Sequence, residues 1–175
     1  MFSNWQNFYV ITGSAAGALT GLQFIVITLI AQRRATSNMR DIRAFGTPNL
    51  VHFCAALLLS ALMAVPWQSL AHFDICLGLC GIGGITYSLR VFWHARKANY
   101  TPDLEDRIWY VVIPFIAHLL LAAAALLLWW NTNYTLLIVA VDTLLFLLLG
   151  IHNSWDTVTY IAVKHKRESG GIDHS

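Results

Sequence analysis

The sequence predicts an all-α integral membrane protein, a bundle of five transmembrane helices formed by a single domain over residues 1–175. Of its 175 residues, 57% are apolar and 11% are charged, whereas charged residues make up about a quarter of an ordinary soluble domain. The apolar residues gather in five long runs, and a helix of about 20 apolar residues is long enough to cross a bilayer. The hydrocarbon layer offers no water to the backbone, so these runs must be helical. The predicted spans are residues 8–30, 49–70, 75–93, 108–130 and 134–163.

The first span, Phe8–Ile30, contains no charged side chain. The residues before it, Met1–Asn7, include no Lys or Arg, and the apolar run is too long for a signal peptide, so we expect a permanent span. Gly13, Gly17 and Gly21 are spaced four apart within it. Glycines at this spacing share one helix face and allow another helix to approach closely. The sequence therefore predicts a helix-packing surface, which we call the glycine ladder.

The glycine ladder is compatible with two interpretations. It could pack inside one subunit, for example against the third span, which has small residues of its own at Gly78, Gly81 and Gly84. It could equally form a contact between subunits of a homo-oligomer, or with another protein of a larger membrane complex. Thr20 lies near the same face and could donate a hydrogen bond across it. We expect Gln23, at mid-membrane depth, to bond to a neighbouring carbonyl rather than to a substrate.

Proline residues mark the expected limits of the later spans. Thr47-Pro48 and Thr101-Pro102 each put a capping hydroxyl before a proline that suits the first helical turn. Pro66 is expected to end or bend the second span. The third span, residues 75–93, follows after a short polar turn. The fifth span, residues 134–163, is longer than the hydrocarbon layer is thick, at about 1.5 Å per residue, so its last turns should emerge from the membrane.

The basic residues predict the orientation of the bundle. All eleven Lys and Arg residues fall at alternate ends of the five spans, which means on one side of the membrane. Short loops rich in Lys and Arg stay in the cytoplasm, so we expect the N-terminus outside and the C-terminus in the cytoplasm. These short basic segments suit the anionic headgroups of the lipid bilayer, and they are too short to be nucleic-acid modules. The eleven residues are Arg33, Arg34, Arg40, Arg43, Arg90, Arg96, Lys97, Arg107, Lys164, Lys166 and Arg167.

One stretch of the first span is similar to a known class of protein. Residues Gly13–Phe24 are rich in small side chains and end in Ala-Leu-Thr-Gly-Leu-Gln-Phe. This stretch resembles the opening span of small uncharacterised bacterial polytopic inner-membrane proteins. The resemblance covers only this span. It implies a location in the bacterial cytoplasmic membrane and brings no function with it.

Asp142 is the most unusual residue of the fifth span. It lies eight positions beyond Tyr134, hence about 12 Å below the outer interface, where an Asp side chain costs roughly 2.5–3.5 kcal/mol. The fourth and fifth spans should form a hairpin that brings His118 to a similar depth, and a contact between the two side chains would offset part of that cost. Either the pair is a proton or cation relay, or it is a hydrogen bond that fastens two helices. The predicted polar edge of this span comprises Asp142, Leu145, Leu149, Asn153, Asp156 and Tyr160.

A second polar group lies in the inner part of the fifth span. His152 and Asp156 are four residues apart and should interact directly. His52 and His94 are expected at the same level, so three histidines and a carboxylate could converge to bind haem b or a metal ion, or to pass protons. In a simpler interpretation, Asp156 pairs with an arginine of the loops while His52 and His94 cap helix ends. The arginines expected within reach are Arg34, Arg43 and Arg96.

The sequence contains no nucleophile elbow, phosphate-binding glycine loop or H-E-x-x-H motif, so we lean towards a protein that is not an enzyme. We expect a small membrane protein without a soluble domain that assembles through the glycine ladder, as a homo-oligomer or as an accessory subunit. One alternative is an ion or proton channel or transporter, and another is a haem-binding electron carrier. The candidates for the ion or proton pathway are Asp142, His118, His152, Asp156 and Gln23. The candidates for haem or metal binding are His52, His94 and His152.

Overall fold

A computed structural model of the protein describes residues 3–33, 39–97 and 104–170. Within these ranges the chain is helical, with no β-strand, as the sequence predicts. A short 3₁₀ turn, η1 (Ser3–Trp5), precedes the first helix. The helices are α1 (Gln6–Arg33), α2 (Met39–Ala64), α3 (Leu70–Lys97), α4 (Leu104–Arg107), the π-helix η2 (Ile108–Val112), α5 (Ile113–Leu127) and α6 (Thr132–Gly170).

Five helical segments are long and apolar enough to cross a membrane. The fourth of them consists of η2 and α5, which follow α4 without a break. This agrees with the five predicted spans in number and in approximate position. Length and composition therefore identify an integral membrane protein. The five segments cover residues 6–29, 47–64, 70–93, 108–127 and 132–159.

The helix boundaries differ from those expected. α2 begins at Met39, so Thr47 and Pro48 lie inside it and the predicted cap at these residues is wrong. A helix can continue beyond the hydrocarbon layer, and hydropathy marks only the part inside that layer. α2 ends at Ala64, just before Pro66, as predicted. The second predicted cap, at Thr101-Pro102, lies outside the described residues.

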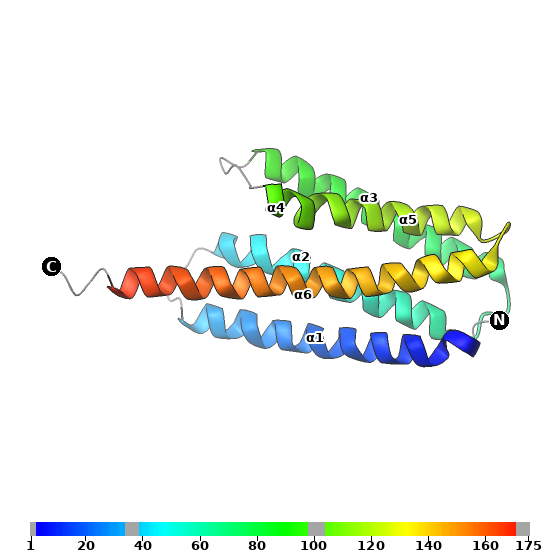
Figure 1. Ribbon diagram of the computed structural model, residues 1–175, viewed down its shortest axis with the longest axis horizontal. Helices are drawn as coiled ribbons and strands as arrows, with labels where there is room; N and C mark the ends of the chain where they lie inside the picture. The colour runs from blue at the N-terminus through cyan, green and yellow to red at the C-terminus, as the bar shows by residue number, and fades with distance from the viewer. Residues whose placement is uncertain (1–2, 34–38, 98–103, 171–175) are drawn as a thin grey trace.

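α6 is the central helix of the bundle (Figure 1). It packs against α2 and α5, and to a smaller extent against α1, and its C-terminal part extends beyond the other helices. The remaining helices form two pairs, α1 with α2 and α3 with α5. Consecutive long helices run in opposite directions, so the two chain termini lie at opposite ends of the bundle. We call these the N-terminal end, where α1 begins, and the C-terminal end, to which α6 extends.

The small residues of α3 do not face α1. Gly81 and Gly84 instead lie against α5, where they leave room for Ala122 and for the ring of His118. The proposed packing of the glycine ladder against the third span is therefore wrong. Because each helix pair meets at its own small residues, α3 is already paired with α5 and is not available to α1.

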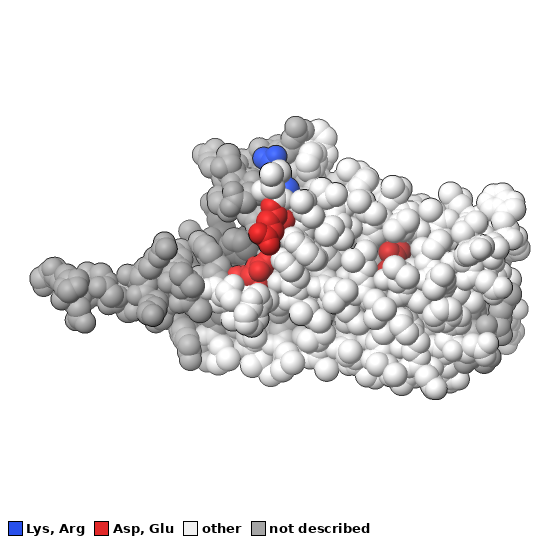
Figure 2. All heavy atoms as spheres, in the orientation of Figure 1, with Lys and Arg blue, Asp and Glu red and all other residues white. Residues whose placement is uncertain are grey.

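Large apolar side chains are exposed on the outside of every long helix. Charged atoms are sparse on the face shown in Figure 2, where acidic side chains gather in a short patch towards the C-terminal end. A soluble monomer rarely exposes so much continuous apolar surface, so this exterior is suited to lipid. Examples of exposed side chains are Ile11, Leu58, Leu79, Leu126 and Leu148.

One turn of π-helix, η2, interrupts the fourth span. Pro114 lies just after it and has no N–H, so the carbonyl of Tyr110 cannot receive the usual backbone bond of an α-helix. The N–H of Ile113 reaches back to the carbonyl of Ile108, five residues earlier. π turns are frequent at functional sites, and this one brings Trp109 and Tyr110 into contact with α6.

Candidate functional site

A column of buried polar side chains runs along one face of α6. Asp142, Asn153 and Thr157 lie on this face and are 0%, 0% and 7% exposed. Asn49 and His52 of α2 are also buried, at 0% and 2% exposure. We call these five residues the polar column. The predicted polar edge was therefore correct at Asp142 and Asn153. The next buried polar residue on this face is Thr157, whereas the predicted Asp156 is partly exposed.

Asp142 is enclosed without a hydrogen-bond partner. Neither of its carboxylate oxygens contacts a donor among the described residues. The predicted bond to His118 is absent, because Nδ1 of His118 lies 2.6 Å from the carbonyl oxygen of Pro114 and 3.3 Å from the hydroxyl of Ser88. Since a carbonyl can only accept, Nδ1 carries the ring proton and donates to Pro114. A helix-fastening role for Asp142 thus lacks the bond that it requires.

His52 and His118 meet the same aromatic ring. The ring centroid of Phe146 is 6.2 Å from that of His52 and 4.8 Å from that of His118. Neither ring nitrogen of His52 has a hydrogen-bond partner within residues 3–33, 39–97 and 104–170. His52 also lies well inside α2, which begins at Met39, so its expected role as a helix cap is wrong. Phe146 is one helical turn from Asp142, and the two histidines therefore adjoin the turn that carries the buried carboxylate.

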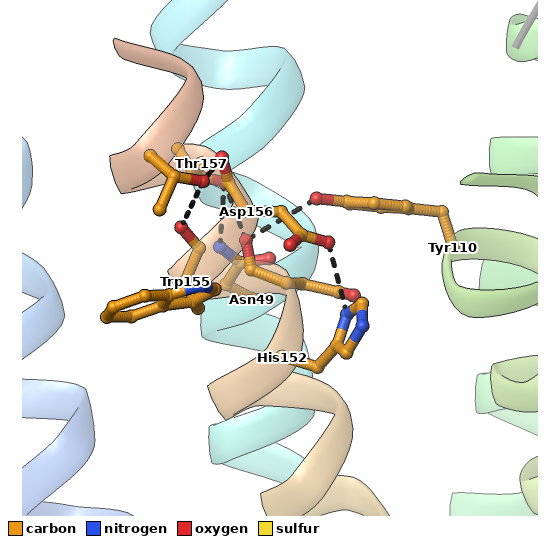
Figure 3. A network of polar contacts seen from close by, with 8 residues as sticks. Asn49, Tyr110, His152, Trp155, Asp156 and Thr157 are labelled. Carbon is orange, nitrogen blue, oxygen red and sulfur yellow. Dashed lines mark hydrogen bonds and ion pairs between the residues drawn. The ribbon is translucent and has the colours of Figure 1, made fainter. Parts of the chain in front are cut away.

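A small hydrogen-bond network joins α2, α6 and η2 nearer the C-terminal end (Figure 3). Nδ2 of Asn49 donates to the hydroxyl of Thr157 at 3.4 Å, and that hydroxyl lies 2.7 Å from the backbone oxygen of Asn153. The hydroxyl of Tyr110 donates to the same backbone oxygen at 3.4 Å. Oδ1 of Asn49 and both side-chain polar atoms of Asn153 have no partner among the residues that the structure describes. The network therefore holds the α6 backbone at Asn153, and these side-chain donors and acceptors stay unpaired inside the described part of the bundle.

His152 and Asp156 form a separate pair beside η2. Nδ1 of His152 lies 3.1 Å from Oδ2 of Asp156, which confirms the direct contact expected from their spacing. The two side chains are 27% and 43% exposed. The His152 ring stacks on Trp109, with centroids 3.8 Å apart and an angle of 11° between the planes. The arginines proposed as partners of Asp156, at positions 34, 43 and 96, have side chains outside the described part of the chain.

The proposed convergence of three histidines finds no support in the described residues. His52 faces Phe146, whereas His152 faces Trp109. His94 belongs to α3, and its side chain lies outside the described residues. Over the described residues, no group of three or more His, Cys, Asp and Glu side chains could hold a metal ion. His52 and His152 therefore belong to different local environments.

Gln23 fastens α1 to α6. It is buried, and its Oε1 accepts a hydrogen bond from the hydroxyl of Ser154 at 3.1 Å. The observed bond at this amide is therefore made to a hydroxyl of α6. Because this amide oxygen is already engaged by a neighbouring helix, we regard Gln23 as a packing residue rather than as part of an ion pathway.

The glycine ladder is only partly covered. A Cβ at Gly13 would lie 3.0 Å from the Cβ of Ser60 on α2, so this glycine allows close packing inside the subunit. Gly17 and Gly21 are exposed, and a Cβ at either position would meet nothing within 4 Å. Thr20 donates to the carbonyl of Ala16 in its own helix, at 2.8 Å, rather than to another helix.

Asn49 and Phe146 were not assigned a role from the sequence. Asn49 follows Pro48 and was therefore assigned to the start of a helix, although α2 already extends across it. An amide inside an apolar run is a usable signal, because its polar atoms require partners at that depth. Phe146 carries no such signal, since one phenylalanine among the leucines of α6 resembles any core residue.

The fold and the polar column together define a helical integral membrane protein with an internal polar site. Comparison of the chain with models of protein families, with curated proteins and with solved structures finds no match. The geometry of the site is therefore the basis for assigning a function to the protein.

Proposed function

We propose that the protein is a pathway for protons or small cations through the membrane, with Asp142 as its central ion-binding group. The observation that carries this proposal is the burial of Asp142, at 0% exposure, with no hydrogen-bond partner for either carboxylate oxygen in the described part of the chain. An ionisable residue inside a membrane helix is costly, and such residues typically mark ion or proton pathways.

The surroundings of Asp142 support a transport role over a structural one. A residue that fastens helices would form a hydrogen bond, as Thr12 of α1 and Ser60 of α2 do, whose hydroxyls lie 3.0 Å apart. A lone carboxylate can hold and release a cation without breaking any bond of the bundle. His118 and His52 adjoin the next turn of α6 through Phe146, and imidazoles are suited to accept and donate protons.

We further propose that the C-terminal end of the bundle faces the cytoplasm and that the membrane is the bacterial inner membrane. The eleven basic residues at alternate ends of the spans support this orientation. The resemblance of Gly13–Phe24 to bacterial inner-membrane proteins supports the location.

Replacing Asp142 with asparagine should lower proton flux in proteoliposomes by about a hundredfold or more, because positioned acid–base groups contribute at least that much to proton transfer. Flux is measured with a pH-sensitive dye trapped in the liposomes under an imposed pH gradient and, separately, under Na⁺ or K⁺ gradients. Asp74→Asn is the matched control, since Asp74 lies near the N-terminal end and accepts a bond from Trp129. A wild-type flux equal to that of empty liposomes would contradict the proposal.

A second candidate function is assembly through α1, as a homo-oligomer or as an accessory subunit of a membrane complex. The open faces of Gly17 and Gly21 favour it, since these glycines have no packing role within the subunit. Gly17→Leu should then reduce the mass of the complex measured in detergent or lipid nanodiscs. The matched control is Gly83→Leu on α3, because Gly83 is also exposed with nothing within 4 Å. An unchanged mass for the Gly17 variant would exclude this form of assembly.

A further inference from the structure

We infer that Asn49, His52 and Asn153 hold internal water that relays protons from Asp142 towards the C-terminal end, which makes the pathway selective for protons over metal cations. This inference rests on the proposed function. It adds the identity of the transported ion and a second site along α6.

The first support for this inference is that several buried polar atoms without hydrogen-bond partners cluster in one part of the described bundle. Asn49, His52 and Asn153 are each at most 2% exposed. Among the described residues, Oδ1 of Asn49, both ring nitrogens of His52 and both amide atoms of Asn153 have no hydrogen-bond partner. Buried polar groups are normally hydrogen-bonded, so several unsatisfied groups in one region indicate a guest that supplies the bonds.

The three side chains also belong to one region of the bundle. Asn49 and His52 are three residues apart on the face of α2 that packs against α6. Asn49 reaches Thr157, and Thr157 reaches the backbone of Asn153. His52 extends towards Phe146. The unpartnered atoms therefore occupy the α2–α6 interface between Phe146 and Thr157.

The mixture of donors and acceptors identifies the guest as water. Nδ2 of Asn153 and one nitrogen of a neutral His52 can only donate, whereas the two amide oxygens can only accept. A bare metal cation would satisfy the acceptors and leave the donors unpaired, and an anion would do the reverse. Water donates and accepts at once, and buried water typically makes about three such bonds.

The geometry also gives the relay its order. Asp142 and Asn153 are eleven residues apart on one face of α6, which is about 16 Å along the helix. His52 lies in this interval beside Phe146, with both ring nitrogens unpartnered. It can accept a proton at one nitrogen and release another from the second. Each water likewise accepts a proton from one neighbour and passes one to the next, so that only O–H and N–H bonds are exchanged.

The test uses the full-length protein in proteoliposomes with Asn153→Leu and Asn49→Leu, which remove the hydrogen-bonding groups at similar side-chain volume. Proton flux should fall about tenfold in Asn153→Leu, because two hydrogen-bonding atoms are lost and each is worth a few-fold. Thr159→Val is the control, since the Thr159 hydroxyl bonds only to carbonyls of its own helix. Sodium and potassium flux should equal that of empty liposomes in every variant.

Infrared spectra give a second readout that does not depend on transport. Bands of internal water, identified by their shift in water labelled with heavy oxygen, should be present in the wild type and lost in both leucine variants. If Asp142→Asn blocks flux while Asn153→Leu conducts normally and keeps the bands, the relay is wrong and the proposed function stands. If the wild type does not conduct, the proposed function fails. The infrared bands still test the internal water in that case. If the wild type lacks these bands, the inferred water site is wrong.

Discussion

Replacing Gly81 with alanine should lower the free energy of unfolding by about 1–3 kcal/mol, the range expected when a close-packed interface is overfilled. The added Cβ would lie 2.7 Å from the backbone nitrogen of Ala122 and 2.8 Å from its Cα. Backbone atoms cannot rotate away as the end of a side chain can, so α3 and α5 must separate. Helix association in membranes depends on such close contact, because there is no hydrophobic driving force between helices in lipid.

The measurement is equilibrium unfolding in mixed micelles of mild detergent and dodecyl sulfate, followed by circular dichroism. Gly83→Ala is the matched control two positions away, because a Cβ there meets nothing within 4 Å. The control should unfold at the wild-type detergent fraction or above it, since alanine favours helix over glycine by about 1 kcal/mol. Equal stability of the two variants would mean that α3 and α5 do not meet at Gly81.

Replacing Gly84 with alanine should destabilise the bundle by about 3 kcal/mol, because overpacking adds to the loss of a buried hydrogen bond. The new Cβ would overlap the imidazole of His118. His118 is buried and bonded to the carbonyl of Pro114 and the hydroxyl of Ser88. The ring would therefore have to leave both partners, and a polar ring would be displaced into an apolar environment.

A double-mutant cycle separates this clash from a general cost of alanine at Gly84. In a His118→Ala background the ring is gone, so Gly84→Ala should cost much less than it does in the wild type. Residues in direct contact typically show coupling of about 0.5–3 kcal/mol. Additive effects of the two substitutions would show that Gly84 and His118 do not touch.

The membrane fold could be predicted from the sequence because each span is recognised by its own residues. Apolar runs such as 108–130 are local, and so is the contact of His152 with Asp156, which one helical turn brings together. Helix limits were harder to predict. The stretch from Met39 to Pro48 includes three charged residues and gives no hydropathy signal for a span, yet α2 includes it.

The candidate site could be predicted only in part, because it depends on which helix faces meet. Asp142 was identified from its predicted depth in the membrane alone. In the structure its side chain is buried, which agrees with that prediction. The bond to His118 was inferred from matching depth, but depth does not determine the rotation of a helix, and His118 turns to Pro114 and Ser88. The contact of His52 with Phe146 joins α2 to α6, and no local pattern encodes it.

The central place of α6 has a consequence for biogenesis. When the chain is inserted into the membrane from its N-terminus, α1 and α2 can pair first and α3 and α5 next, since each pair has its own contact surface. Until α6 enters, Asn49 and His52 of the first pair have no covering helix. Polar groups are costly against lipid, so the α1–α2 pair remains incomplete until α6 covers these two side chains. Insertion of α6 is therefore the step that commits the membrane-inserted chain to its native bundle.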